Sequence, residues 1–163
     1  MRLWRPWNGF QPVQPSQPCA APGSDLRTRR AYLLTTVTHN RQPIFADWQL
    51  ARLLISEMRR LHDAKLVESY AWVVMPDHLH WLVQLDHVAL ATLMQQLKSR
   101  SAIAINKSHP IHHGRLWQKG FHDHALRREE DLLATARYIV ANPLRAGLTQ
   151  RLGDYPLWDA IWL

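Results

Sequence analysis

The sequence has little cysteine, few acidic residues and no long apolar run, and each shortage excludes a class of protein. Its single cysteine, Cys19, cannot form an internal disulfide or supply a thiolate cluster for a metal, which fits a reducing cytosol. Because no stretch of about 18 apolar residues occurs, we expect no membrane-spanning helix and no membrane partner. The 163 residues suffice for one domain with its own core but not for two.

The shortage of acidic residues leaves the chain strongly basic. Thirteen Asp and Glu stand against 20 Lys and Arg, which gives a formal charge of +7. Most of the excess is arginine, whose planar guanidinium suits phosphate. This balance predicts affinity for polyanions, and nucleic acid in particular. The alternative is a basic protein without a polyanionic partner.

The chain divides into a tail and one domain. Residues 1–25 hold half of the ten prolines, mixed with Gln, Ser and Gly and without a helix or strand period, so we expect a loosely ordered tail there. Residues 26–163 are predicted to form a single domain.

Apolar periodicity within the domain predicts an alternation of strands and helices. Strands are expected over 32–38, 67–75, 78–85 and 116–126, and helices over 47–61, 90–105 and 131–142. The order β-α-β-β-α-β-α is typical of an α+β, ferredoxin-like fold, a split βαβ antiparallel sheet with helices on one face. The last helix is additional and carries Tyr138. The other sheet face is expected to be open for a ligand.

A histidine pair lies at the start of the third predicted strand. His78 and His80 are two residues apart, so their side chains point to the same face, while Leu79 and Trp81 point to the other. Two neutral imidazoles placed in this way can hold a divalent cation together with a third ligand. The alternative is a pair of polar residues on a solvated strand face, because His-x-His is a short motif.

A tyrosine lies on the last predicted helix, away from the apolar stripe of that helix. At about 100° per residue, Tyr138 lies roughly 160° from the centre of the stripe, and Asn142 follows one turn later on nearly the same side. A phenol can attack phosphorus to form a phosphotyrosine, and the amide oxygen can join two histidines on a metal that polarises the phosphate. The alternative is a surface tyrosine with an asparagine at the helix end.

Two distant segments together resemble a known family. The stretch 70–85, which contains Met-Pro-Asp-His-Leu-His-Trp, resembles the HUH segment of the single-strand transposases that use one tyrosine. The stretch 116–127, Leu-Trp-Gln-Lys-Gly-Phe-His-Asp-His-Ala-Leu-Arg, and the stretch 138–148, Tyr-Ile-Val-Ala-Asn-Pro-Leu-Arg-Ala-Gly-Leu, closely resemble the branch called REP-associated tyrosine transposases. The likeness covers residues 31–148 in matching order and spacing.

The resemblance implies a ferredoxin-like fold, a bound Mg²⁺ or Mn²⁺, and cleavage of single-stranded DNA beside the hairpins of repetitive extragenic palindromes. Cleavage would leave a 5′-phosphotyrosine and a free 3′-hydroxyl, and the reverse reaction would rejoin strands. Carried over by position, Tyr138 is the nucleophile, and His78, His80 and Asn142 hold the metal. Related insertion-sequence transposases have glutamine where this chain has the shorter Asn142, which favours the REP-associated branch.

The same resemblance implies a bacterial, cytoplasmic, nucleoid-associated protein. Its relatives include dimers that exchange their tyrosine helices, while the REP-associated branch is open to monomers, so either a monomer or a homodimer is consistent with it. Among other polar residues, His122 and His124 alternate on the predicted strand 116–126; they could support the metal site, contact DNA or be surface residues, with His124 the stronger candidate for a site role. Candidates for phosphate contact are Arg100, Lys119, Arg127, Arg128 and Arg145.

Two other functions are consistent with parts of the pattern. One is an HUH replication initiator acting on an origin hairpin, although the run Asn-Pro-Leu-Arg-Ala-Gly at 142–147 argues against it. The other is a non-catalytic nucleic-acid-binding module of ferredoxin-like fold. Such modules stack bases on aromatic residues of the open sheet face, whereas here that face is predicted to carry histidines.

Overall fold

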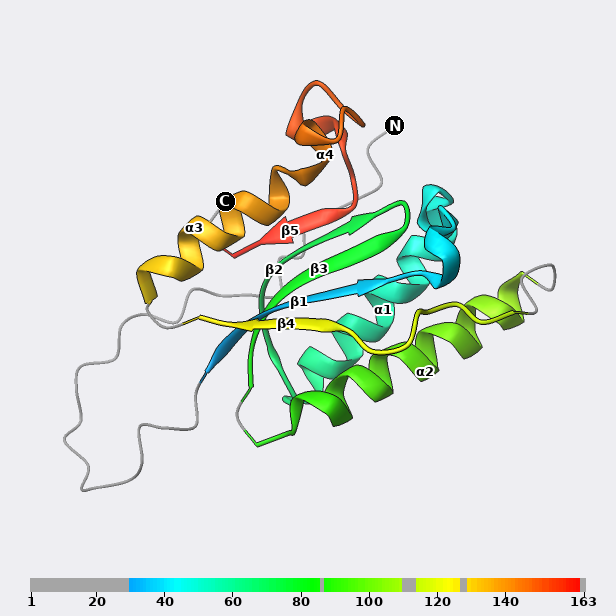
Figure 1. Cartoon of the computed structure of the whole chain (residues 1–163), viewed down its shortest axis with the longest axis horizontal. Helices are drawn as coiled ribbons and strands as arrows, with labels where there is room; N and C mark the ends of the chain where they lie inside the picture. Colours follow the sequence, from blue (N-terminus) through cyan, green and yellow to red (C-terminus); the bar gives the residue numbers. More distant parts are fainter. Residues whose placement is uncertain (1–29, 86, 110–113, 127–128, 162–163) are drawn as a thin grey trace.

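The computed structural model describes residues 30–85, 87–109, 114–126 and 129–161. The predicted tail, 1–25, lies outside these residues. Figure 1 shows one sheet with helices on both sides. The strands are β1 (Ala31–Val37), β2 (Glu68–Met75), β3 (His78–Gln84), β4 (His122–Ala125) and β5 (Trp158–Ala160); the α-helices are α1 (Trp48–Asp63), α2 (Leu90–Ser108), α3 (Glu129–Val140) and α4 (Asn142–Arg145); and short 3-10 turns are η1 (His39–Arg41), η2 (Ile44–Ala46) and η4 (Leu152–Asp154).

The sheet has the topology that the sequence predicts. Its strand order is β4-β1-β3-β2-β5, and every neighbouring pair is antiparallel. β3 lies between β1 and β2, which is the split βαβ arrangement of the ferredoxin-like fold. The α+β, ferredoxin-like prediction is therefore confirmed. The short edge strand β5, next to β2, extends the sheet beyond the predicted elements.

One face of the sheet is covered by α1 and α2. Asp47 caps α1, as its sequence position suggests, because its carboxylate accepts a hydrogen bond of 2.8 Å from the Gln49 amide. The alternate residues Leu79, Trp81 and Val83 of β3 are buried in the main core against these helices. The Trp81 indole N–H donates to the Ser69 hydroxyl at 2.8 Å, so the largest buried side chain has no unpaired donor. Among the described residues, no helix has the length and apolar content needed to cross a bilayer.

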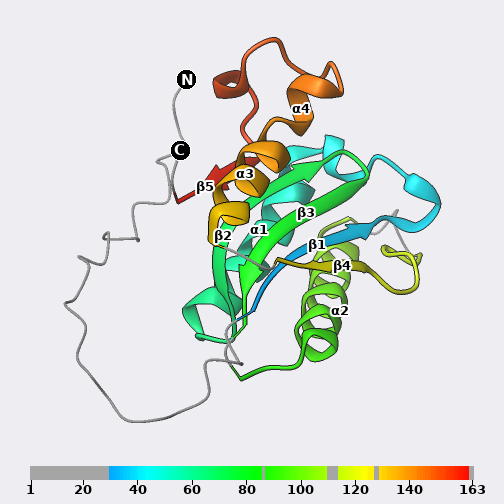
Figure 2. The same ribbon diagram turned by 60° about the vertical axis from the view of Figure 1, so that its left-hand side comes forward.

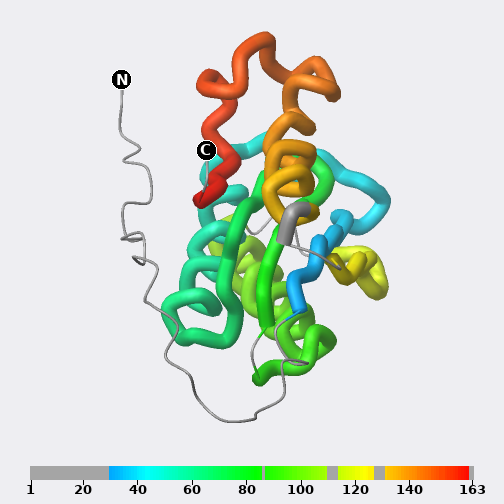
Figure 3. The backbone as a smooth tube through the Cα atoms, turned by 90° about the vertical axis from the view of Figure 1, so that its left-hand side faces the viewer, coloured from blue at the N-terminus to red at the C-terminus, as the bar shows by residue number. Residues whose placement is uncertain are grey.

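The sequence pattern predicted that the opposite face of the sheet is open. This prediction is wrong, because α3 packs on part of that face. Ala136, Ile139 and Val140 of α3 form a second buried cluster with Val73 of β2 and Leu82 of β3. Figures 2 and 3 show α3 next to β2 and β3, while β1 and β4 lie to its side. The prediction failed because the apolar stripe of α3 is buried against the sheet, where it contacts Ala71, Val73 and Leu82. Among the described residues, α3 leaves the part of this face over β1 and β4 uncovered.

Two predicted boundaries are wrong. The strand expected over 116–126 is only the four-residue β4, since residues 118–121 form a loop that follows a single bridge between Trp117 and Thr38. The helix expected over 131–142 ends at Val140, and a second short helix, α4, begins at Asn142. Pro143 explains the break, because it has no N–H to donate to the carbonyl four residues earlier.

Candidate metal and nucleophile site

The two histidines lie together at the start of β3, on the face that α3 covers in part. His78, His80 and Leu82 alternate to the same side, and Leu82 is buried in the α3 cluster. The imidazole rings of His78 and His80 meet edge to face, with centroids 4.8 Å apart and planes at 83°. The predicted juxtaposition of the pair is therefore present in the structure.

Each imidazole is held through its Nδ1 atom by a different neighbour. Nδ1 of His80 pairs with the Thr35 hydroxyl across the strands at 2.8 Å, and Nδ1 of His78 pairs with the Asp77 carboxylate at 2.5 Å. Within the described parts of the chain, neither Nε2 atom has a hydrogen-bond partner. If both Nδ1 atoms carry their proton toward these oxygen acceptors, both Nε2 lone pairs face outward, which is the tautomer that metal-ligating histidines adopt.

The turn that carries Asp77 is fixed by its backbone. The Asp77 carbonyl accepts from the Thr38 amide at 2.9 Å and from the Thr38 hydroxyl at 3.0 Å. Its carboxylate also pairs with Arg41 at 3.0 Å. Partial burial alone would raise the pKa of Asp77, but the hydrogen bond and charge of His78, together with those of Arg41, lower it overall. Asp77 is therefore a carboxylate at neutral pH and can accept the His78 proton.

His80 is a neutral base at neutral pH. Burial is the main cause that lowers its pKa to about 4, and the nearby charges of His78 and Arg145 lower it further. A neutral imidazole is the form that binds a metal ion.

Arg145 connects the predicted nucleophile to the predicted third ligand. Tyr138 is 56% exposed on α3, and the Arg145 guanidinium lies over its ring, 3.7 Å from the centroid. The same guanidinium donates to Oδ1 of Asn142 at 2.5 Å. Arg145 thus contacts both Tyr138 and Asn142, a role that the sequence pattern had indicated only as a candidate phosphate contact.

The break before Pro143 fixes the orientation of the Asn142 side chain. In a continuous helix the residue at 143 would donate its N–H to the carbonyl of Ile139, but proline cannot. Nδ2 of Asn142 donates to that carbonyl instead, at 3.0 Å. The amide nitrogen is therefore committed to the backbone, and the oxygen is the end that is presented to Arg145 or to a ligand.

The adjacent imidazoles of His78 and His80 are chemically able to hold a divalent cation. No group of three or more His, Cys, Asp or Glu side chains with metal-ligand geometry exists among the described residues, so an all-protein cage of those types is absent there. Two imidazoles and one carboxamide would instead leave several coordination positions for phosphate oxygens. Ions that act on phosphate typically keep such open positions.

The other predicted contact residues lie in different places. Arg100 on α2 pairs with Glu57 of α1 at 3.0 Å, so it belongs to the helix layer on the other side of the sheet from the histidines. Lys119 lies in the loop before β4 and lines a groove with Thr35. His124 is exposed on β4, opposite Leu33 of β1. Arg127 and Arg128 lie outside the described residues.

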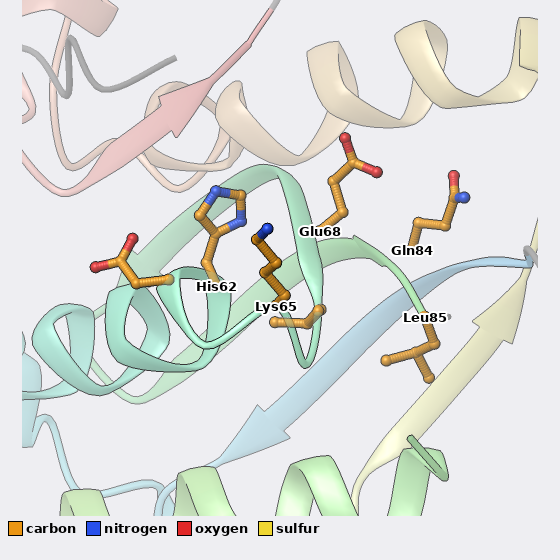
Figure 4. Close-up of a pocket in the computed structure, with 7 residues that line it drawn as sticks. His62, Lys65, Glu68, Gln84 and Leu85 are labelled. Atoms are coloured by element: carbon orange, nitrogen blue, oxygen red, sulfur yellow. The ribbon is translucent and has the colours of Figure 1, made fainter. Parts of the chain in front are cut away.

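A separate cavity of about 370 Å³ lies at the far end of the sheet. Figure 4 shows its lining, which includes His62, Lys65, Glu68 and Gln84. Gln84 and His78 lie at opposite ends of β3, so the length of the strand lies between this cavity and the histidine pair. The candidate site is therefore separate from the cavity of Figure 4.

Sequence patterns did not reveal what Thr35, Asp77 and Arg145 do in the site. Asp77 directly precedes His78, and Arg145 follows Asn142 by three residues, so spacing alone could have suggested both contacts. The pairing of Thr35 with His80 depends on the register of β1 against β3, in which the two residues are direct partners. Local sequence carries no direct signal for that register.

The sequence and the fold are both similar to known transposases. Residues 28–142 match the family model described as "Transposase IS200 like". A REP-associated tyrosine transposase of Escherichia coli K12 is 28% identical over 134 residues, which are 81% of this chain and 70% of that protein. A putative REP-associated tyrosine transposase of Haemophilus influenzae is 29% identical over 99 residues, 55% of this chain and 56% of that protein.

Two solved structures share the fold. One is a REP-associated tyrosine transposase bound to a REP hairpin, with a TM-score of 0.63 and 21% identity over 86% of this chain and 82% of the other. The second is a putative transposase of Deinococcus radiodurans, with a TM-score of 0.55 and 22% identity over 74% of this chain and 95% of the other.

Proposed function

The chain belongs to the IS200-like transposase family, and from this premise we propose that it cleaves and rejoins single-stranded DNA beside hairpins through Tyr138. The observation that carries the proposal is the paired orientation of the histidines. Asp77 and Thr35 hold both Nδ1 atoms, which leaves both Nε2 atoms for a metal ion, close to the helix that carries an exposed tyrosine. The REP hairpin bound by a protein of the same fold suggests REP-like palindromes as the DNA.

In the proposed reaction, the Tyr138 hydroxyl oxygen attacks the scissile phosphorus. A new P–O bond to tyrosine forms, the bond to the 3′ oxygen breaks, and the phenol proton leaves to solvent while the 3′ oxygen gains one. The products are a 5′-phosphotyrosine and a 3′-hydroxyl, and the reverse attack rejoins a strand. A Mg²⁺ or Mn²⁺ ion held by His78, His80 and Asn142 would polarise the phosphate and stabilise the charge that develops on its oxygens.

The residues around the nucleophile suit this chemistry. The Arg145 guanidinium already lies on the Tyr138 ring and holds Asn142, and its remaining N–H groups can donate to a phosphate oxygen. The exposure of Tyr138 allows a DNA strand to reach it from solvent. The net charge of +7 favours the approach of that strand.

The direct test is covalent capture. The protein is incubated with hairpin oligonucleotides that carry single-stranded flanks and a label at the 3′ end, in Mn²⁺, and the products are boiled in detergent and separated by gel. We expect a labelled adduct with the wild type and with Tyr32→Phe, a control for a half-buried tyrosine of the main core. Tyr138→Phe is expected to form none; an adduct of unchanged yield in that variant would refute the proposal.

The metal requirement is tested on the same substrate. His78→Ala, or the wild type in chelator, is expected to lose the adduct while retaining most DNA binding, because phosphate contacts persist without the ion. Adduct formation in chelator at the wild-type rate would exclude the two-histidine site. Binding without any adduct from the wild type would favour a non-catalytic DNA-binding module instead.

A further inference from the structure

The half of the sheet face that α3 leaves uncovered continues directly from the histidine pair. Thr35 of β1 is the register partner of His80 on one side and of His122 on the other. Register partners in antiparallel strands point to the same face, so His80, Thr35 and His122 form one row across β3, β1 and β4. Neighbouring strands are about 4.8 Å apart, which places His122 roughly 10 Å from His80.

A groove of about 110 Å³ lies at the end of this row. Its floor is β1 and its wall is the loop that precedes β4. Besides Gly120, its lining residues are Thr35, Val37, Gln118, Lys119, Phe121 and His122. Because Thr35 both lines the groove and holds Nδ1 of His80, the groove adjoins the proposed metal site.

The wall of the groove is fixed in place by backbone contacts. The Lys98 ammonium of α2 donates to the carbonyls of Gln118 and Gly120, each at 2.6 Å. The Gln118 amide donates to the Val37 carbonyl at 2.9 Å, and Gly120 makes the bend with a φ of +70°. These contacts use no side-chain atom of Gln118, Lys119 or His122, all of which are exposed. The groove is therefore preformed, and its rim side chains are free to meet a ligand.

The chemistry of the lining matches an unpaired nucleotide. Val37 and Phe121 provide apolar surface for the face of a base, and the His122 imidazole is a plane on which a base can stack. The Gln118 carboxamide can donate to and accept from one base edge. The Lys119 ammonium can pair with the phosphate, and no carboxylate is among the groove's described lining residues.

We infer that this groove binds one unpaired nucleotide of the DNA strand next to the scissile phosphate. The inference rests on the proposed function, because it takes the histidine pair as the place where the phosphate is bound. It adds a base-binding subsite, formed by Gln118 and His122 with Lys119 at its edge, that would help to select the position of cleavage.

Binding of an abasic probe tests the inference without any chemistry. All proteins carry Tyr138→Phe, and affinities are measured in EDTA by fluorescence anisotropy. The probe is the tightest-binding member of a library of hairpin oligonucleotides with randomised single-stranded flanks. Each flank nucleotide is then replaced in turn by an abasic residue.

We expect one flank position at which the abasic residue weakens binding by at least about fivefold, since stacking of one base contributes about 1–3 kcal/mol. In Gln118→Ala/His122→Ala the same replacement is expected to change affinity by less than about twofold, because the contact is already lost. Gln95→Ala, on the exposed face of α2, is the matched control and is expected to keep the full penalty. An undiminished penalty at that flank position in the double variant would overturn the inference.

The proposed function can fail separately. A groove-dependent abasic penalty combined with no covalent adduct from the wild-type protein would refute the nuclease and keep the subsite. An adduct from the wild type without any groove-dependent penalty would refute the subsite and keep the nuclease. Failure of every library member to bind would refute both.

Discussion

Replacing Asp77 with alanine is expected to weaken Mn²⁺ binding about 10- to 100-fold, the usual loss when a carboxylate behind a ligating histidine is removed. The Asp77 carboxylate lies 2.5 Å from Nδ1 of His78, which is a short, charge-assisted contact. Without it, His78 can rotate and can place its proton on Nε2, the atom needed for the metal. The turn itself is expected to persist, because Thr38 holds it through the Asp77 carbonyl.

Two further variants separate charge from geometry. In Asp77→Asn the amide oxygen can still accept the Nδ1 proton, so only the negative charge is lost and we expect less than about a tenfold decrease in affinity. In Arg41→Ala the carboxylate loses an ion-pair partner that is 66% exposed. Exposed ion pairs contribute about 0–1 kcal/mol, so affinity is expected to fall by no more than about fivefold.

The assay is a Mn²⁺ titration followed by electron paramagnetic resonance, in which free Mn²⁺ gives the signal and no DNA is present. Thermal unfolding of each variant shows whether the domain is intact. Equal affinity of Asp77→Ala and the wild type, within twofold and with an unchanged Tm, would refute the role of Asp77. An Arg41→Ala defect as large as that of Asp77→Ala would show that charge in the turn, and not orientation of His78, controls binding.

Three other expectations follow from particular contacts. Thr36→Val is expected to stabilise the domain by about 1–2 kcal/mol in urea unfolding, because its buried hydroxyl has no partner among the described residues. Thr38→Val is expected to destabilise it, because it removes the one hydroxyl proton that the Gln42 and Asp77 carbonyls share. His80 has a pKa of about 4 in the folded protein against an ordinary 6.5, so the unfolded chain binds this proton at higher pH than the folded protein does. The free energy of unfolding, measured in EDTA, is therefore expected to fall between pH 6.5 and pH 4 by up to about 3 kcal/mol more than in His80→Gln. A parallel pH profile in the variant would contradict this. Arg145→Ala is expected to strengthen Mn²⁺ binding in the absence of DNA by up to about tenfold, because the guanidinium occupies the Asn142 oxygen and its positive charge acts on His80; weaker binding in Arg145→Ala would contradict this and show that Arg145 supports Asn142.

Alternation along the chain predicted much of the fold. The two faces of β3 follow directly from the period of the strand, which separates Leu79 and Trp81 from His78 and His80. The apolar stripe of the last helix was also correctly identified, yet the surface that it covers was not. That surface is made by Val73 and Leu82, which come from different strands and become neighbours only after the sheet has formed.

The candidate site shows the same division between local and long-range information. The spacing of His78 and His80 and the position of Tyr138 are local, and the structure brings these residues into one region through Arg145. The pairing of Thr35 with His80 and the groove beside it depend on strand register, which no short motif encodes. The roles of the ligands and of the nucleophile stay predictions until metal binding and covalent capture are measured.

The proline after Asn142 has a consequence for which amino acid can occupy position 142, the proposed place of the third ligand. An aspartate would attract a divalent cation more strongly on charge alone, but it has no N–H to offer. At this position it would leave the Ile139 carbonyl without the donor that Pro143 cannot provide, and would set a second oxygen against the first. A carboxamide has an N–H that donates to the Ile139 carbonyl and an oxygen that remains available as an acceptor. The missing backbone donor at Pro143 thereby favours an uncharged carboxamide at position 142 over a carboxylate.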